Sequence, residues 1–120
     1  MLLLGIDLGT SSVKVSVIQA NTLQLLASAQ YPESESGIIS PQPGWAEQDP
    51  ETWWDHVQKA ILKVHAQRKY DPNDIGAIGI AYQMHGLVCI DKDQQVLRNS
   101  IIWCDSRAVD LGKEAFEKIG

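Results

Sequence analysis

The sequence predicts an α/β domain whose strands form a mixed sheet. Three apolar segments near the amino terminus are separated by short polar turns, which predicts an antiparallel three-strand meander. Further along the chain, strand-length apolar runs alternate with helical patterns, which is typical of a sheet flanked by helices. At 120 residues, with 44% hydrophobic and 21% charged residues, the chain has the length and composition of one globular domain.

The meander is predicted within residues 2–31. Residues 2–8 form an apolar run that predicts a buried strand. In residues 13–18 valines alternate with Lys14 and Ser16, which predicts a half-buried strand. Asn21 and Thr22 predict a turn, and residues 23–31 predict the third strand.

An irregular loop and a helix are expected next. Residues 32–50 hold four of the five prolines and predict a loop. Asp49 is expected to cap a helix that has Pro50 at its first position and runs to about Lys69. The helix should end before Pro72, because proline disfavours helical geometry at the preceding residue. The residues expected on its buried face are Trp54, Val57, Ile61 and Val64.

The rest of the chain predicts three short strands and a second helix. Residues 75–83, 86–91 and 100–103 have strand length and apolar character, and residues 91–94 predict a turn. Asp105 or Ser106 is expected to cap a helix whose apolar face comprises Ala108, Leu111, Ala115 and Ile119. No further element follows to close the sheet, so we expect this chain to be an incomplete part of a larger fold.

Charge and cysteine usage exclude several classes of protein. The net charge is −5, and the ten Lys and Arg residues are scattered, so a nucleic-acid partner is not expected. The start lacks the basic region of a signal peptide, and no apolar run reaches the roughly 20 residues of a membrane helix. Cys89 and Cys104 are expected to be buried thiols in a reducing compartment, which predicts a cytoplasmic protein without a membrane partner.

The segment GIDLGTSSVKV, residues 5–15, suits either a tight turn or a phosphate cradle. Gly9 can supply unusual backbone angles, and small hydroxyl residues are common in turns. Asp7, however, lies in an apolar strand, where a carboxylate costs free energy unless it is paired or binds a cation. At the strand's end it could hold Mg²⁺ through waters while the following amides and hydroxyls face phosphate oxygens.

Two further segments have both a structural and a functional interpretation. YQMHG, residues 82–86, ends a strand, where it forms either a glycine turn with a hydrogen-bonded histidine or a ligand site at the sheet edge. In WCDSR, residues 103–107, Trp103 either packs in the core or lies along the apolar face of a polyol. Asp105 is either a helix cap or, with Arg107, a polar contact to that polyol. Trp45 lies in a Pro/Gly loop that is expected to pack on something.

Together these segments resemble the amino-terminal part of the FGGY carbohydrate kinases. The resemblance covers GIDLGTSSVKV, PGWAEQDPETWW, IGAIGIAYQMHG and VLRNSIIWCDSR, in that order, and so nearly the whole chain. DLGT alone is shared with Hsp70-type chaperones and other sugar kinases of the actin-like ATPase superfamily, whereas QMHG and WxDxR separate this family from them.

The resemblance implies a ribonuclease H-like fold and transfer of the ATP γ-phosphoryl group to a ketopentose, with D-xylulose as the expected sugar. It implies ATP and Mg²⁺ as cofactors, with Mg²⁺ at Asp7. The first phosphate loop would comprise Gly9, Thr10, Ser11 and Ser12. The residues expected at the sugar are Gln83, Met84, His85, Trp103 and Asp105.

The resemblance also implies that residues 1–120 are the amino-terminal portion of the N-terminal domain. The C-terminal domain, the adenine pocket and the catalytic aspartate are expected downstream, so no catalytic residue is assigned in this chain. A homodimer of the full-length parent is retained as one possible assembly. Two alternatives remain open at this stage. One is a kinase for another sugar or sugar acid, such as ribulose or gluconate, and the other is a non-catalytic ATPase-fold module that binds a partner.

Overall fold

A computed structural model describes every residue of the chain, Met1–Gly120. The residues group into two compact units. Unit 1 comprises Met1–Gly37 and Glu51–Gln83, and unit 2 comprises Ile38–Pro50 and Met84–Gly120. Unit 2 is made of two separate segments because the end of the Pro-rich loop pairs with residues near position 100.

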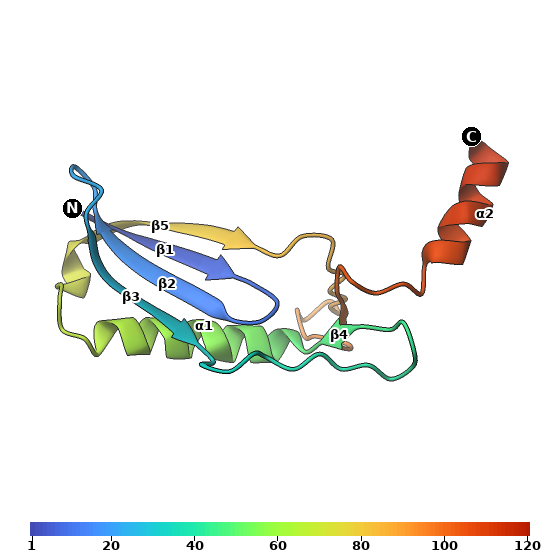
Figure 1. Cartoon of the computed structure of the whole chain (residues 1–120), viewed down its shortest axis with the longest axis horizontal. Coiled ribbons are helices and arrows are strands. Elements are labelled where there is room, and N and C mark those ends of the chain that lie inside the picture. Colours follow the sequence, from blue (N-terminus) through green and yellow to red (C-terminus); the bar gives the residue numbers. More distant parts are fainter. The chain divides into compact units, whose positions relative to one another are not determined.

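Unit 1 is built on a four-stranded mixed sheet of order β3-β2-β1-β5 (Figure 1). Its strands are β1 (Leu2–Leu8), β2 (Val13–Gln19), β3 (Leu25–Tyr31) and β5 (Ile75–Tyr82). The first three strands form the predicted antiparallel meander, which is therefore confirmed. β5 joins β1 in parallel, so the carboxyl ends of β1 and β5 lie at the same edge of the sheet.

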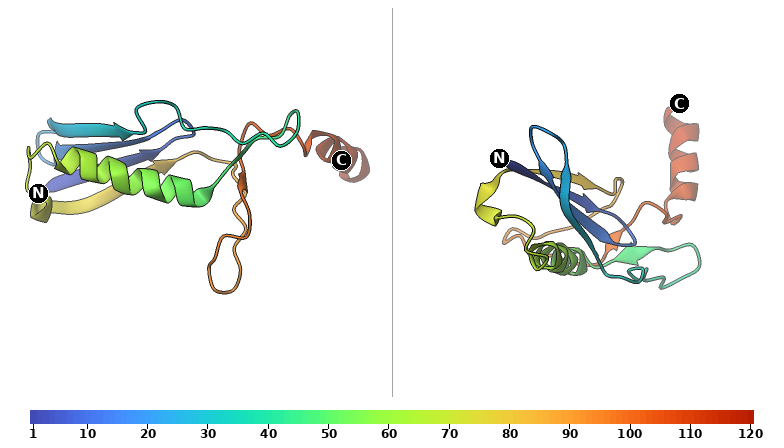
Figure 2. Two further views of the ribbon diagram at one scale, coloured as in Figure 1. Left: turned by 90° about the horizontal axis from the view of Figure 1, so that it is seen from below. Right: turned by 60° about the vertical axis from the view of Figure 1, so that its left-hand side comes forward.

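Helix α1 (Pro50–His65) covers one face of this sheet (Figures 1 and 2). It ends four residues before the expected Lys69, and Arg68 has a left-handed φ of 53°, which ends any helical continuation. A short 3-10 turn, η1 (Pro72–Asp74), then leads into β5, as the proline predicts. Trp54 was expected on the buried face but is 60% exposed; the buried stripe follows Val57, Ala60 and Val64 instead.

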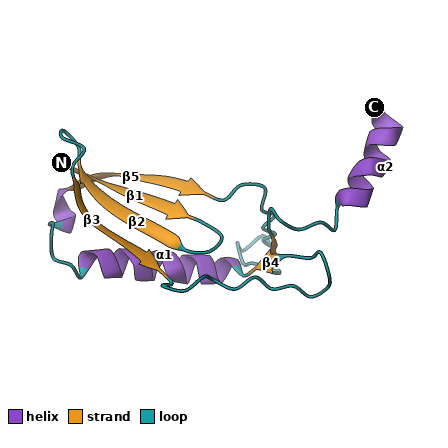
Figure 3. Cartoon of the chain, viewed as in Figure 1, coloured by secondary structure: helices purple, strands orange, loops and turns teal.

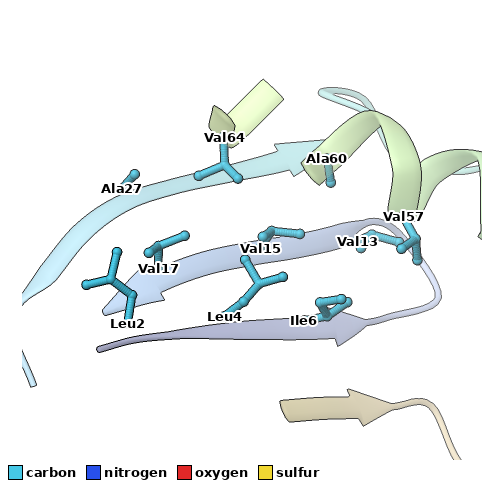
Figure 4. Close-up of a cluster of buried hydrophobic side chains, with 10 residues drawn as sticks. All are labelled: Leu2, Leu4, Ile6, Val13, Val15, Val17, Ala27, Val57, Ala60 and Val64. Atoms are coloured by element: carbon cyan, nitrogen blue, oxygen red, sulfur yellow. The ribbon is translucent and has the colours of Figure 1, made fainter. Parts of the chain in front are cut away.

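The core of unit 1 lies between α1 and alternate positions of the meander (Figure 4). β1 and β2 each contribute every second residue, because side chains of a strand point alternately to the two faces. The core residues are Leu2, Leu4, Ile6, Val13, Val15, Val17, Ala27, Val57, Ala60 and Val64. β1 is therefore buried on one face only, and Asp7 lies on the open face, where it is exposed.

Unit 2 contains a two-stranded antiparallel ladder and a second helix. β4 (Glu47–Gln48) pairs with β6 (Ser100–Ile101), a shorter strand than the predicted 100–103. The prediction of a strand at residues 86–91 is wrong. That segment is loop (Figure 3), held by isolated bridges from Leu87 to Ile101 and from Ile90 to Val96. The predicted turn at 91–94 lies inside this loop and is closed by an N–H from Gln94 to the carbonyl of Asp91.

Helix α2 (Val109–Ile119) begins later than expected and buries none of its residues (Figure 1). Its N-cap is Ala108, without a side-chain hydrogen bond, so the expected caps at Asp105 or Ser106 are wrong. Asp105 is instead engaged by a neighbouring arginine, described below. The predicted apolar face of α2 is exposed: Leu111 is 67% and Ile119 84% accessible.

Two further expectations can be compared with the structure. Cys104 is exposed and Cys89 is half-buried, so the expectation of two buried thiols is wrong; both are free. Neither helix is long and apolar enough to cross a membrane.

Candidate functional site

The turn between β1 and β2 is closed by its own backbone. The N–H of Gly9 donates to the carbonyl oxygen of Ser12 over 3.1 Å. A Cβ at position 9 would lie 3.0 Å from that oxygen, which is too close for comfortable packing. Gly9 does not have a positive φ, so the expected reason for a glycine here, an unusual backbone angle, is wrong. The close approach of Ser12 favours glycine instead.

Asp7 lies on the open face of the sheet beside Lys14. The two residues pair directly across β1 and β2, and both line a groove of about 530 Å³ together with Ser16 and Gly79. The desolvation cost expected for Asp7 does not arise, because strand alternation directs it away from the core. Lys14 is not among the site residues that the sequence predicts, and strand pairing brings it to Asp7. Counting outward from the four-residue turn pairs it with Asp7 and would have found it.

The DLGT turn is joined to the end of β5 through Gln83. The backbone N–H of Gln83 donates to the carbonyl of Leu8 over 2.9 Å, which extends the parallel pairing of β1 and β5. The Thr10 hydroxyl donates to Oε1 of Gln83 over 2.8 Å. The first residue of the QMHG segment is therefore fixed to the turn that the sequence predicts as a phosphate loop. This position, at the carboxyl edge of two parallel strands, is where α/β sheets commonly bind ligands.

His85, in unit 2, adopts an unusual backbone conformation. Its φ is 64°, in the left-handed region that glycine occupies most readily and in which asparagine, aspartate and histidine are enriched among the other residues. Both Met84 and His85 are exposed, with Met84 64% accessible. His85 is therefore not the buried, hydrogen-bonded histidine that was one of the two interpretations of the sequence.

Trp103 follows β6 and is 59% exposed, so it does not pack in the core. The turn that carries it is closed by an N–H from Asp105 to the carbonyl of Ile102, over 3.0 Å. β6 itself accepts a hydrogen bond from the segment after His85: the N–H of Leu87 donates to the carbonyl of Ile101 over 2.9 Å. The Trp103 turn and the segment after His85 are thus attached to the same short strand, within unit 2.

Asp105 lies in the same turn and has a different environment from Trp103. Its side chain is only 3% exposed, and both carboxylate oxygens accept hydrogen bonds from Arg107. The Arg107 guanidinium, assisted by the backbone N–H groups of Ala46 and Arg107, holds the pKa of Asp105 well below its usual range. Asp105 in turn raises the pKa of Arg107. This carboxylate is ionised and already fully engaged by protein donors.

The structure brings the predicted residues together in two groups. Unit 1 holds the phosphate-loop group at one sheet edge, joined there by Gln83: Asp7, Gly9, Thr10, Ser11 and Ser12. Unit 2 holds Met84, His85, Trp103 and Asp105 around β6.

The donor set at Asp7 fits a cation that shares its ligands with phosphate. Nowhere in the chain do three or more His, Cys, Asp or Glu side chains gather as a metal-binding cluster. Mg²⁺, however, keeps several waters and commonly uses one or two carboxylates plus substrate phosphates. The exposed Asp7 carboxylate, beside a groove and two residues before the turn, is one such ligand.

Comparison with known proteins places the chain in a family. The model of the FGGY family of carbohydrate kinases, N-terminal domain, matches residues 2–119. The chain is 37% identical over 118 residues to the xylulose kinase of Bacillus subtilis, covering 98% of this chain and 23% of that protein. The chain therefore spans less than a quarter of the length of this curated relative.

Solved structures give the same result and confirm the predicted fold class. A crystal structure of a xyloylose kinase from Brucella ovis superposes with a TM-score of 0.83 at 35% identity, over 99% of this chain and 25% of that one. A gluconate kinase from Lactobacillus acidophilus superposes equally well, at 0.83 and 31% identity, over 98% of this chain and 22% of that one. The chain belongs to the FGGY family of carbohydrate kinases, by its match to their N-terminal domain.

Proposed function

We propose that residues 1–120 are the amino-terminal part of a larger kinase that phosphorylates D-xylulose to D-xylulose 5-phosphate with ATP. The observation that carries this proposal is the link between Thr10 and Gln83, which ties the DLGT turn to the beginning of QMHG. A phosphate-binding turn and a sugar-binding segment are thereby connected within a few residues. Xylulose kinases among the relatives favour the ketopentose as the acceptor.

The phosphate end of the reaction is assigned to the turn after β1. The Gly9 amide and the Thr10 hydroxyl hold the shape of the turn of residues 9–12, and the amides and hydroxyls of Ser11 and Ser12 would bind phosphate oxygens. Asp7 would hold Mg²⁺ through water molecules. Lys14, in register with Asp7, adds a positive charge beside the same groove. Phosphoryl transfer requires positioning and charge neutralisation more than covalent chemistry, and these residue types supply both.

The sugar end is assigned to Gln83, Met84, His85 and Trp103. His85 and Gln83 offer hydrogen bonds to hydroxyls, and Trp103 offers an exposed apolar ring to the carbon face of the sugar. The acceptor hydroxyl forms the new P–O bond as the bond to the β-phosphate oxygen of ATP breaks. Its proton passes to a catalytic aspartate expected downstream of this chain, which holds no catalytic base of its own.

The same proposal covers location and assembly. A kinase that consumes ATP and free pentose works where both are available, and we place it in the cytoplasm. A homodimer of the full-length kinase stays a prediction, which light scattering on the purified protein measures.

A phosphorylation screen of the full-length kinase tests the proposal. D-xylulose should be phosphorylated with a higher kcat/KM than ribulose, gluconate or glycerol. His85→Ala should raise the sugar KM by about tenfold or more and change the ATP KM by less than about twofold, since only the sugar contact is lost. No preference for D-xylulose, or equal effects on both KM values, would contradict the assignment.

Gluconate is the second candidate substrate. The gluconate kinase superposes on this chain as well as the Brucella ovis kinase does, so the amino-terminal fold alone does not separate the two sugars. If gluconate is the better substrate in the screen, the kinase assignment stands and the acceptor changes. A non-catalytic module is disfavoured because His85 and Trp103 are exposed rather than packed in a core.

A further inference from the structure

Asp105 has no free acceptor position facing solvent. Its Oδ1 accepts the backbone N–H and the Nε of Arg107, at 2.8 and 2.9 Å. Its Oδ2 accepts the backbone N–H of Ala46 at 2.6 Å and Nη2 of Arg107 at 2.7 Å. With a side chain only 3% exposed, this carboxylate would have to give up a protein donor before it could accept a sugar hydroxyl.

Arg107 extends the network from Asp105 to a second segment. Its Nη2 also donates to Oε1 of Glu47 at 2.8 Å, and Arg98 donates to the same oxygen at 2.8 Å. The Arg107 guanidinium lies 3.8 Å from the centre of the Trp45 ring, a cation–π contact. Trp45 and Glu47 both belong to the segment of residues 44–48, which we call the Trp45 strap.

Backbone contacts hold the Trp45 strap in register with the Trp103 turn, residues 102–106. The N–H of Ile102 donates to the carbonyl of Ala46 over 3.1 Å. Both the N–H and the hydroxyl of Ser106 donate to the carbonyl of Gly44, at 2.8 and 2.9 Å. Gly44 has a φ of 81°, and a Cβ there would lie 2.5 Å from the Ser106 hydroxyl oxygen. A side chain at position 44 would therefore clash with Ser106.

We propose that Asp105 is a positioning residue: through Arg107 it fixes the Trp45 strap against the Trp103 turn and so orients the exposed Trp103 ring for the sugar. This inference rests on the proposed function, because it assumes that Trp103 contacts the sugar. It replaces the direct sugar contact that the sequence predicts for Asp105. The segment after His85 is hydrogen-bonded to β6 as well, through the N–H of Leu87. A change in the Trp103 turn is therefore expected to affect this segment too.

A double-mutant cycle in the full-length kinase separates positioning from direct binding. The variants are Asp105→Asn, Arg107→Lys and the pair, with Asp110→Asn as the matched control because its carboxylate is 96% exposed on α2. Lysine keeps the charge of Arg107 and loses the fork that grips both oxygens of Asp105. Each single variant should raise the sugar KM by about tenfold, with ATP KM changed by less than about twofold, and the pair should be no worse than either.

The opposite pattern overturns the inference. A sugar ligand at position 105 predicts that Asp105→Asn raises the sugar KM while Arg107→Lys leaves it unchanged, or that the two effects multiply. A second signature uses monodeoxy analogues of D-xylulose. Positioning scales the KM of all analogues together, whereas loss of a direct bond spares the analogue that lacks the bonded hydroxyl. If Asp105→Asn does not fold, Arg107→Lys with the monodeoxy analogues decides, since positioning raises the KM of every analogue by the same factor and a direct bond from Arg107 spares one of them.

An arm without catalysis keeps this inference separate from the proposed function. In protein labelled with 5-fluorotryptophan, the ¹⁹F resonances of Trp45 and Trp103 are assigned by their loss in Trp45→Phe and Trp103→Phe. Asp105→Asn and Arg107→Lys should each shift both resonances in the absence of sugar, and Asp110→Asn should shift neither. Unchanged resonances in both variants overturn the positioning role. If the wild-type kinase phosphorylates no ketose, the proposed function is overturned. The ¹⁹F measurement still tests the positioning role, because it needs no substrate.

Discussion

Asp7 lies within β1 and Asp105 lies in the turn after β6, and the two carboxylates have opposite surroundings. Asp7 is exposed on the open face of the sheet, beside a groove that it shares with Lys14. Asp105 is enclosed by an arginine fork and by the N–H of Ala46. An open carboxylate can take a solvated cation, whereas an enclosed one orients the groups that enclose it.

Asp7→Asn should lower kcat/KM for Mg-ATP by about a hundredfold in the full-length kinase, because the cation loses its anionic ligand. The far-ultraviolet circular dichroism and the thermal midpoint should change little, since Asp7 lies outside the core. Steady-state kinetics at varied Mg²⁺ and a thermal melt measure the two effects. A variant that fails to fold would show that Asp7 is structural instead.

Acid should destabilise unit 2 through Asp105. Arg107 lowers the pKa of this carboxyl in the folded state, so the folded form stays ionised where the unfolded form binds a proton. The stabilisation is present above the ordinary carboxyl pKa of about 4 and is lost as the pH falls below it. Urea unfolding at a series of pH values should therefore show a steeper loss below about pH 4 in the wild type than in Asp105→Asn. Parallel curves would contradict this.

At the scale of elements, α1 is fixed by one stripe of small and β-branched residues. Val57, Ala60 and Val64 meet the valines of β2 on the face that the sheet alternation selects (Figure 4). The bulkier Trp54 was expected there but lies outside this stripe. Helix α1 does not cover β5. Ile78 and Ile80 of β5 pair in register with core residues of β1, yet Ile78 is 60% and Ile80 63% exposed.

Val64→Ala should lower the free energy of unfolding by about 1–3 kcal/mol, because it removes buried methyl groups and leaves a cavity against the sheet. Leu62→Ala on the same helix is the control, since Leu62 is 66% exposed and its loss should change the value by less than about 0.5 kcal/mol. Urea denaturation followed by circular dichroism measures both. Equal losses in the two variants would mean that α1 does not pack as described.

At the scale of the whole molecule, the chain holds two groups of candidate residues and only a fraction of its relatives' length. It covers 23% of the Bacillus subtilis xylulose kinase. The proposed function places the catalytic aspartate outside it. On the proposed assignment, the base that accepts the hydroxyl proton lies outside residues 1–120, and phosphoryl transfer to a sugar hydroxyl is not completed without it.

The isolated 120-residue chain should therefore show no measurable ATP-dependent phosphorylation of D-xylulose. A coupled assay that detects ADP measures this, with the full-length kinase as the positive control. Turnover by the isolated chain that disappears in Asp7→Asn would show that a catalytic base lies within residues 1–120.

The meander, α1 and β5 could be predicted from sequence because each has its own local periodicity and its own start or stop residues. The DLGT, QMHG and WxDxR segments could be found for the same reason, since each is a short continuous motif. The strand expected at 86–91 could not be excluded locally: its residues are apolar, but only isolated bridges pair with them. The start of α2 was also missed, because Asp105 binds Arg107 rather than the helix end.

The sequence by itself determined the fold class, the family resemblance and the residue types at the proposed phosphate and sugar segments. These depend on local patterns and on the order of motifs along the chain. Only the tertiary structure decided which face each residue takes and which partner it binds. It exposed Asp7 beside Lys14, joined Thr10 to Gln83, and enclosed Asp105 behind Arg107. Such pairings join residues far apart in sequence, so they depend on strand register and packing rather than on local propensity.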